Sequence, residues 1–265
     1  MFKEKIKQIT KKIIFERDSR LKVNLFIVGE QKCGTTSFHQ FLRMHNGFIN
    51  SRLGKEVNYF NSDRFNQNDH SFYEKSYRYD IRFKRNPKYL IDSSTNYGFS
   101  ELALQRIADY NPNARIIFIE RNPVERFFSA YKFYKYVVYK FPKTDYDMEV
   151  RKWMEENPKF NITNFFEKET SENPVFLALR KGEFQKTKAL ILSIFNEKNV
   201  LFLKFEDLTT PKTFKEIVIP TCSNFLGLEL DPNLEFPSEN SSGFYENLKI
   251  PHIKEYLEEY YKLNP

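Results

Sequence analysis

Short runs of consecutive apolar residues alternate along the chain with stretches in which apolar residues recur every three or four positions. The short runs are typical of strands buried on both faces, and the spaced pattern is typical of helices with one apolar face. The strands that this pattern predicts are residues 22–28, 88–92, 114–120 and 199–205. The helices that it predicts are residues 35–45, 101–110, 124–139, 184–196, 211–226 and 251–262. Strands that alternate with helices predict an α/β fold whose parallel sheet is covered on both faces.

Two stretches have no clear period. Residues 46–88 are polar and aromatic and are expected to mix helix with loop, and residues 141–174 are irregular with helical pieces. No stretch has the Gly, Ser and Pro content of a linker, and no segment repeats. A chain of 265 residues without a linker predicts one large domain.

Residues 1–20 form a separate element in this interpretation. Phe2, Ile6, Ile9 and Ile13 fall on one face of a basic amphipathic helix. We expect this helix to pack on the domain, which is predicted to span residues 21–265. The same pattern would also allow peripheral contact with a membrane surface.

The charge and cysteine content narrow the classes of partner. The chain has 42 Lys and Arg against 35 Asp and Glu, a net charge of +7, which fits an anionic ligand or simply a Lys-rich surface. No zinc-finger spacing and no RNA-recognition signature occurs, so nucleic acid is not an expected partner. Two cysteines imply no disulfide framework, and no apolar run approaches the roughly 20 residues of a membrane span. We therefore expect a cytoplasmic protein.

The first candidate site is residues 29–37 (GEQKCGTTS), which follow the predicted strand 22–28. Glycines let the backbone turn tightly, so that amides of the turn and of the next helix point at an anion. The glycine spacing matches a Walker A loop, G-x-x-x-x-G-K-[ST]. However, Thr35 stands at the lysine position of that motif, and Lys32 lies inside the loop.

The second candidate site is residues 120–129 (ERNPVERFFS), at the end of another predicted strand. Arg121 leaves the strand end, where a basic side chain is a sensible anion ligand, and Ser129 follows two helical turns later. Pro123 is well placed in the first turn of the helix. An ordinary strand-to-helix turn with a surface arginine is an equally good interpretation of this segment alone.

Together the two segments resemble the sulfotransferases that use 3′-phosphoadenosine-5′-phosphosulfate (PAPS), and the heparan sulfate group more than the cytosolic phenol and steroid group. In that family a K-x-G-T-[TS] loop binds the 5′-phosphosulfate, and residues 32–36 have this form. A later R-[DN]-P-x-x-R-x-x-S segment binds the 3′-phosphate, which implies that role for Arg121 and Ser129. The similarity extends, with gaps, over residues 22–245.

A third match names a base. The family carries K-E-x-x-[HY]-F after the first helix, and residues 55–60 (KEVNYF) stand in that place. The resemblance implies that Glu56 takes the proton from the acceptor, a role that suits a carboxylate near a sulfuryl centre. Without the resemblance, Lys55 and Glu56 would be interpreted as a surface ion pair.

Weaker matches and two departures complete the comparison. Residues 205–208 (FEDL) resemble a structural segment that ends a late strand in the family. Residues 180–184 (RKGEF) resemble an element near the cofactor, and residues 241–245 (SSGFY) resemble a loop that closes over the adenosine and the 3′-phosphate. Two lysines of the heparan sulfate enzymes are absent, at Ser93 and at Ser242. The departures bear on the acceptor more than on the use of PAPS.

The expected fold is therefore α/β, a P-loop-type three-layer fold with a central parallel β-sheet flanked by helices. We expect in-line transfer of a sulfuryl group from PAPS to a hydroxyl or amine, with Glu56 as base and Lys32 stabilising the leaving oxygen, and without a metal. The residues expected to bind the cofactor are Lys32, Cys33, Gly34, Thr35, Thr36, Ser37, Arg121, Ser129, Ser242, Gly243, Phe244 and Tyr245.

Several alternatives stay open at this point. The acceptor could be a glycan, which the resemblance favours, or a small natural product, because acceptor loops vary on a shared cofactor platform. A P-loop kinase of small molecules that uses ATP and magnesium is a rival, as is a non-catalytic protein that binds anionic glycans. Without a membrane anchor or disulfides, a bacterial cytoplasmic enzyme fits better than one of the Golgi lumen.

Overall fold

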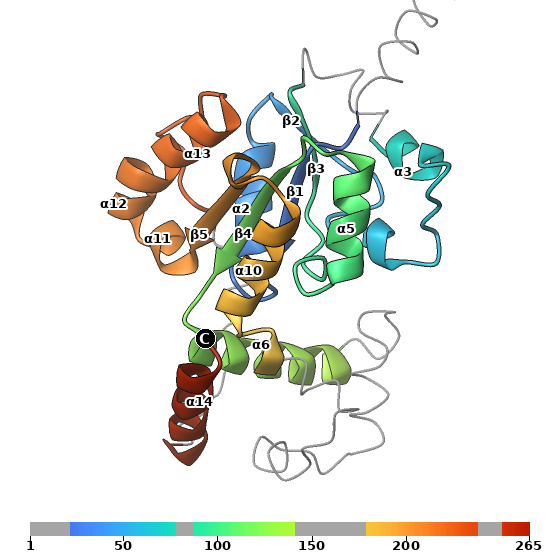
Figure 1. The fold of residues 1–265 in the computed structure, drawn as a ribbon. Coiled ribbons are helices and arrows are strands. Elements are labelled where there is room, and N and C mark those ends of the chain that lie inside the picture. The colour runs from blue at the N-terminus through green and yellow to red at the C-terminus, as the bar shows by residue number, and fades with distance from the viewer. Residues whose placement is uncertain (1–21, 78–86, 141–178, 238–250) are drawn as a thin grey trace, which may run out of the picture.

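The computed structural model of the protein describes residues 22–77, 87–140, 179–237 and 251–265 (Figure 1). Its strands form one five-stranded parallel sheet in the order β2-β3-β1-β4-β5. The strands are β1 (Leu25–Gly29), β2 (Phe48–Asn50), β3 (Tyr89–Asp92), β4 (Arg115–Glu120) and β5 (Val200–Lys204). The predicted helix at residues 1–20 lies outside the described residues.

The order of the strands reverses at β1. From this central strand the chain moves outward to β2, returns to β3, and then crosses to β4 and β5 on the other side. All five residues of β1 are buried, which agrees with a strand covered on both faces. Parallel sheets of this type bind ligands beyond the carboxyl ends of the strands beside such a reversal. The loops after β1, β3 and β4 therefore face the expected site.

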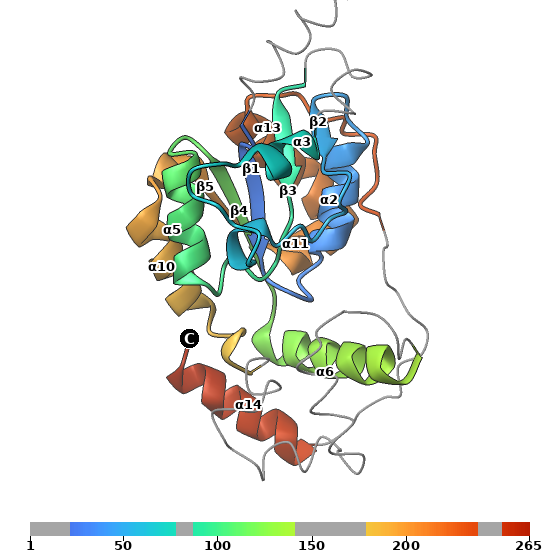
Figure 2. The same ribbon diagram turned by 90° about the vertical axis from the view of Figure 1, so that its right-hand side faces the viewer.

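Helices cover both faces of the sheet. Figures 1 and 2 show α5 and α10 on one face and α2, α11 and α13 on the other, while α6 and α14 lie beyond the carboxyl ends of the strands. The α-helices are α2 (Thr35–Arg43), α3 (Ser71–Lys75), α5 (Glu101–Tyr110), α6 (Pro123–Lys140), α10 (Phe184–Ile194), α11 (Phe205–Thr209), α12 (Pro211–Thr213), α13 (Ile219–Leu226) and α14 (Pro251–Leu263). Short 3-10 turns are η1 (Tyr59–Asn61) and η2 (Glu197–Asn199), and η3 (Phe214–Val218) is π-helical. The described part thus has three layers.

The sequence signals for helix ends act as expected in two cases. Ser100 caps α5, because its hydroxyl accepts a hydrogen bond from the amide of Ala103 at 3.2 Å. Asn122 does the same for α6, since its side chain accepts from the amide of Glu125 at 3.1 Å and Pro123 opens the helix. The predicted bounds of residues 101–110 agree with α5.

One part of the pattern was interpreted incorrectly, and one predicted helix has the expected bounds but an internal irregularity. The stretch 46–88 contains β2, a three-residue edge strand that is too short to show a period. The predicted helix 211–226 is divided by the π-helical turn Phe214–Val218 into α12 and α13. Among the described helices, none is both long and apolar enough to cross a membrane.

Candidate functional site

The loop between β1 and α2 is a tight turn that ends at a glycine. Gly34 precedes the first residue of α2 with a φ of 80°, and Lys32 also has a positive φ, of 71°. A Cβ atom at Gly34 would lie 2.7 Å from the ring of Phe205, so only glycine fits here. Thr35, Thr36 and Ser37 form the first turn of α2, and Thr35 and Ser37 are buried. The turn therefore presents a helix N-terminus with hydroxyl groups, which suits an anion.

The segment after β4 contacts this loop. The Nη1 atom of Arg121 donates a hydrogen bond to the carbonyl oxygen of Lys32 at 3.3 Å. The structure thus brings together two of the predicted cofactor-binding residues, 89 positions apart. Ser129 lies further along α6 and is partly exposed. The Oε2 atom of Glu125 lies 4.0 Å from Nη2 of Arg121, so the arginine also has an acidic neighbour.

Phe205 and Glu206 hold the two loops together, a role that the sequence interpretation missed. The guanidinium group of Arg121 stacks 4.4 Å from the centre of the Phe205 ring, whose edge faces Gly34. The carboxylate of Glu206 accepts a hydrogen bond from the backbone amide of Asn122 at 2.9 Å. The signal was present as the F-E-D-L sequence directly after β5, which was interpreted as structural only.

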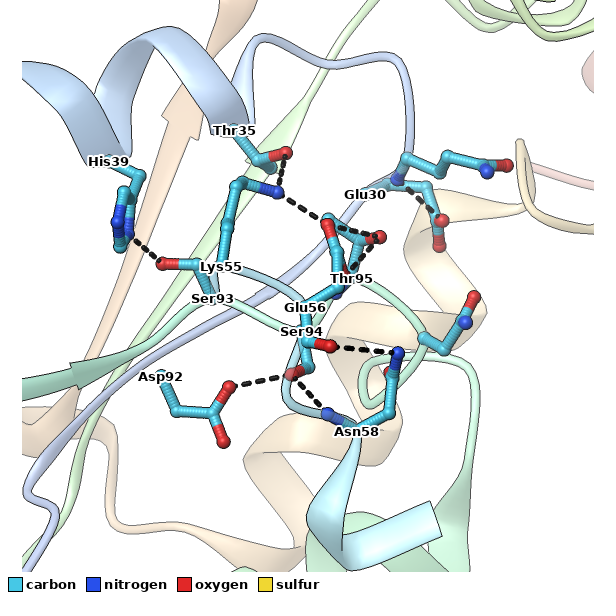
Figure 3. Close-up of polar contacts among 12 residues, drawn as sticks. Glu30, Thr35, His39, Lys55, Glu56, Asn58, Asp92, Ser93, Ser94 and Thr95 are labelled. Atoms are coloured by element: carbon cyan, nitrogen blue, oxygen red, sulfur yellow. Dashed lines mark hydrogen bonds and ion pairs between the residues drawn. The ribbon is translucent and has the colours of Figure 1, made fainter. Parts of the chain in front are cut away.

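Glu56, the predicted base, lies beside the loop that follows β1. Its Oε2 atom accepts a hydrogen bond from the amide of Thr95 at 2.8 Å, and its Oε1 atom accepts one from Lys55 at 2.5 Å. The same Lys55 ammonium group lies 3.4 Å from the hydroxyl of Thr35 in α2 (Figure 3). Residues after β1, β2 and β3 thus meet at one place. A carboxylate held here can accept a proton from a group that reacts next to the loop.

The electrostatics of the loop favour an anion. The pKa of Lys32 is lowered to about 8. Burial is the largest cause, and the positive charges of Arg121, Lys55 and Arg126 contribute to the same decrease. Its ammonium group lies 4.4 Å from the centre of the Phe133 ring on α6. Several cations gathered in a partly buried place repel one another. A bound phosphate or sulfate would relieve that repulsion.

Two further groups in the loop, Cys33 and Glu30, are buried; the predicted cofactor-binding role of Cys33 stays a prediction. Burial raises the pKa of the Cys33 thiol, and the Cys33 amide donates a hydrogen bond to the carbonyl of Glu30 at 3.1 Å, which closes the turn. Glu30 is completely buried, and burial raises its pKa although Lys181 and Arg126 act in the opposite direction. Its Oε1 atom accepts a hydrogen bond from the amide of Gln31 at 2.7 Å. The sequence interpretation assigned no role to Glu30.

A buried network supports the segment that holds Glu56. The carboxylate of Asp92 accepts hydrogen bonds from the hydroxyls of Ser94 at 2.6 Å, Tyr73 at 2.7 Å and Tyr97 at 3.1 Å. The Ser94 hydroxyl in turn accepts from the amide of Asn58, which has a positive φ of 51° (Figure 3). Burial raises the pKa of Asp92 to about 6, although these hydrogen bonds oppose the rise. Asp92 thus fixes both segments that flank Glu56.

Ser93, where the resemblance leads one to expect a lysine, is completely buried. Its hydroxyl lies 2.7 Å from Nδ1 of His39 on α2 (Figure 3). Burial lowers the pKa of His39 to about 3, and the positive charges of Lys55 and Arg43 contribute. His39 is therefore neutral, and this pair supplies no cation to the site.

Some predicted features lie outside what the structure describes or stay untested. Ser242, Gly243, Phe244 and Tyr245 belong to the segment 238–250, which is outside the described residues. Within the described ranges, no group of three or more His, Cys, Asp or Glu residues could hold a metal ion. The expected absence of a metal from the reaction stays a prediction.

Comparison with known proteins settles the family. The sulfotransferase domain family matches residues 22–255. The chain belongs to the sulfotransferase family. This confirms the predicted family and the predicted enzyme class, a transferase.

The sulfotransferase is similar to curated proteins over part of its length. It is 34% identical over 112 residues to the bifunctional heparan sulfate N-deacetylase/N-sulfotransferase 1 of Xenopus tropicalis and 30% identical over 112 residues to that of Homo sapiens. Each match covers 41% of this chain and 12% of the relative, so the chain corresponds to a small part of these proteins.

A solved structure confirms the fold. The crystal structure of a sulfotransferase from Alicyclobacillus acidocaldarius superposes with a TM-score of 0.60 at 22% identity, covering 92% of this chain and 93% of that one. The predicted α/β fold, with a central parallel sheet between layers of helices, is thereby confirmed.

The turn at Gly34 can be tested by adding one methyl group. We expect Gly34→Ala to lower the free energy of unfolding by about 2 to 4 kcal/mol, because the new Cβ is strained at φ 80° and meets the Phe205 ring. Gly54→Ala is the matched control, since Gly54 has a φ of 107° but nothing within 4 Å of its Cβ position. Urea denaturation measures both. An equal loss in the two variants would contradict the role of Phe205.

The burial of Asp92 predicts a dependence of stability on pH. Its pKa is about 6 in the folded protein against an ordinary value of 3.8, so stability that is present below pH 3.8 is lost as pH rises through about 6. Relative to Asp92→Asn, we expect the wild type to lose up to about 3 kcal/mol of unfolding free energy between pH 4 and pH 7.

Urea denaturation across this range measures the difference. Asp109→Asn, at an exposed carboxylate on α5, is the control for the loss of a carboxylate at the surface of the protein. A flat difference for Asp92→Asn would show that Asp92 ionises normally in the folded protein.

Proposed function

We propose that this sulfotransferase takes its sulfuryl group from PAPS and transfers it to a hydroxyl or amine of a carbohydrate, with Glu56 as the base. The observation that carries the proposal is the position of the Glu56 carboxylate, which Lys55 connects to Thr35 in the first turn of α2. The Glu56 carboxylate, which can accept a proton, thus lies next to the turn that suits an anion. The relatives named for heparan sulfate support a sugar acceptor.

The residues around the loop fit a donor with two anionic ends. The helix N-terminus after Gly34 and the Thr35 and Thr36 hydroxyls suit the phosphosulfate, and the cationic surroundings of Lys32 call for negative charge. Arg121 and Ser129 on the β4–α6 segment would hold the 3′-phosphate. PAPS supplies a sulfuryl group bonded to a phosphate leaving group.

Glu56 accepts the proton of the acceptor hydroxyl or amine as that atom attacks sulfur. The new bond to sulfur forms while the bond from sulfur to the bridging oxygen breaks, and the electron pair stays on the departing phosphate oxygen. Lys32 stabilises the negative charge that develops there. Glu56 then releases its proton to solvent, which its partly exposed side chain permits. These roles, and the cytoplasmic location expected from the sequence, are part of the proposal.

Donor binding can be tested by thermal stability. We expect PAP, the desulfated product of PAPS, to raise the melting temperature, because a ligand at about 100 times its dissociation constant adds roughly 2.7 kcal/mol to the free energy of unfolding. Differential scanning fluorimetry with PAP, and separately with magnesium ATP, measures the effect. Stabilisation by magnesium ATP and not by PAP would favour the kinase alternative and overturn the proposed donor.

The base can be tested by Glu56→Gln, which keeps the shape of the side chain but cannot accept a proton at neutral pH. We expect transfer from PAPS to fall at least 100-fold, in the range typical of a lost general base. Binding of PAP, measured by calorimetry, should stay within about threefold, a margin of roughly 0.7 kcal/mol.

Glu101→Gln is the control, because Glu101 is exposed at the start of α5. This variant should turn over like the wild type. Full activity of Glu56→Gln would remove Glu56 from the reaction, and loss of PAP binding would assign it to the donor site instead.

A further inference from the structure

Lys55 contacts both sides of the candidate site. Its ammonium group donates to Oε1 of Glu56 at 2.5 Å and lies 3.4 Å from the hydroxyl oxygen of Thr35. The Lys55 side chain is 18% exposed and that of Glu56 is 23% exposed, so water screens this ion pair only in part. The lysine thus links the loop after β2 to the first turn of α2.

Other cations near the site make different contacts. The ammonium group of Lys32 lies over the Phe133 ring on α6, and that of Lys181 donates to the side-chain oxygen of Asn96 at 3.0 Å. Ser93 contributes no charge, because it is buried against His39. In the described parts of the chain, Lys55 is the cation that contacts both Glu56 and Thr35.

The shortest contacts of the two carboxylate oxygens of Glu56 come from different elements. The amide of Thr95, after β3, donates to Oε2 at 2.8 Å, and Lys55 donates to Oε1 at 2.5 Å. The Thr95 hydroxyl adds longer contacts, 3.3 Å to Oε2 and 3.4 Å to Oε1. The Thr95 contact sets the carboxylate relative to the β3 end of the sheet. The Lys55 contact sets it relative to α2, whose N-terminus forms the anion-binding turn.

We propose that Lys55 is a positioning residue that ties the base Glu56 to Thr35 and so fixes the distance between the base and the donor-binding turn. This inference rests on the proposed function. The hydrogen bond to the carboxylate comes from a charged donor, which makes it stronger than a neutral one. Misplacement of a catalytic group by about 1 Å can cost roughly 100-fold in rate, so the tie should be visible in turnover.

Two substitutions at this position test the role kinetically. We expect Lys55→Met, which keeps the length of the side chain, to lower kcat about 10- to 100-fold while the dissociation constant of PAP changes by less than about threefold. Lys55→Arg keeps the charge and should retain at least a third of the wild-type kcat. If Lys55 acted only by packing, the retained charge would not restore kcat. Lys75→Met, at an exposed lysine on α3, is the matched control and should leave both quantities unchanged.

The results separate the alternatives. A kcat within threefold of wild type for Lys55→Met would overturn the proposal. A tenfold or greater loss of PAP affinity would also overturn it, because Lys55 would then be a direct ligand of the donor. Failure of Lys55→Arg to recover activity would show that the charge is not what matters.

A second measurement does not need transfer activity. In a double-mutant cycle of melting temperatures, Lys55→Met should destabilise the wild type more than it destabilises Glu56→Gln, because the variant has already lost the ion pair. Equal shifts in the two backgrounds would refute the tie even in an active enzyme. If PAPS proves not to be the donor while the cycle shows coupling, the proposed donor fails and the tie between Lys55 and Glu56 stands.

Discussion

The candidate site depends on the close approach of the Phe205 ring to the backbone at Gly34. A side chain at Gly34 would meet the ring at 2.7 Å, so the absence of one lets β5 and α11 reach the turn after β1. The same ring stacks on Arg121, and the neighbouring Glu206 holds the amide of Asn122. One aromatic residue therefore aligns the two segments that the resemblance assigns to the two anionic ends of the donor. Phe205 is partly buried and packs against the hydrophobic core, which supports this alignment.

The charges at the site differ between the loop around Lys32, where cations lie close together, and Glu56, which is paired with a cation. Burial and neighbouring cations lower the pKa of Lys32 to about 8, a cost that stability by itself would select against. On the acceptor side the opposite holds, since Glu56 is matched by Lys55 and by the Thr95 amide. Cations gathered around Lys32, beside a Glu56 carboxylate that is already paired, suit the in-line transfer from an anionic donor that we propose.

Much of this could be predicted from the sequence, and the limits have physical causes. The strands β1, β3, β4 and β5 were found because each is a short run of apolar residues without a helical period, although β5 is mostly half-buried; β2 has three residues and gives no pattern. The glycine turn, Arg121 and Glu56 were found from local motifs. Phe205 and Glu206 were not, because their contacts with Gly34 and Asn122 join elements far apart in the chain. Asp92 was missed for a related reason: its partners Tyr73 and Tyr97 form a site only after the fold brings them together.

The buried pair of Ser93 and His39 separates the chemistry of the site from the choice of acceptor. A lysine at residue 93 would bring a charge into a place that is completely buried, where an ion is costly unless it is paired. Ser93 instead shares a hydrogen bond with a neutral histidine, so the loop after β3 supports Glu56 without attracting an acidic acceptor. Any attraction for a charged polysaccharide must then come from residues outside this loop. The proposed base Glu56 and its supports could thus stay the same while the acceptor changes, as happens where one fold carries different sites.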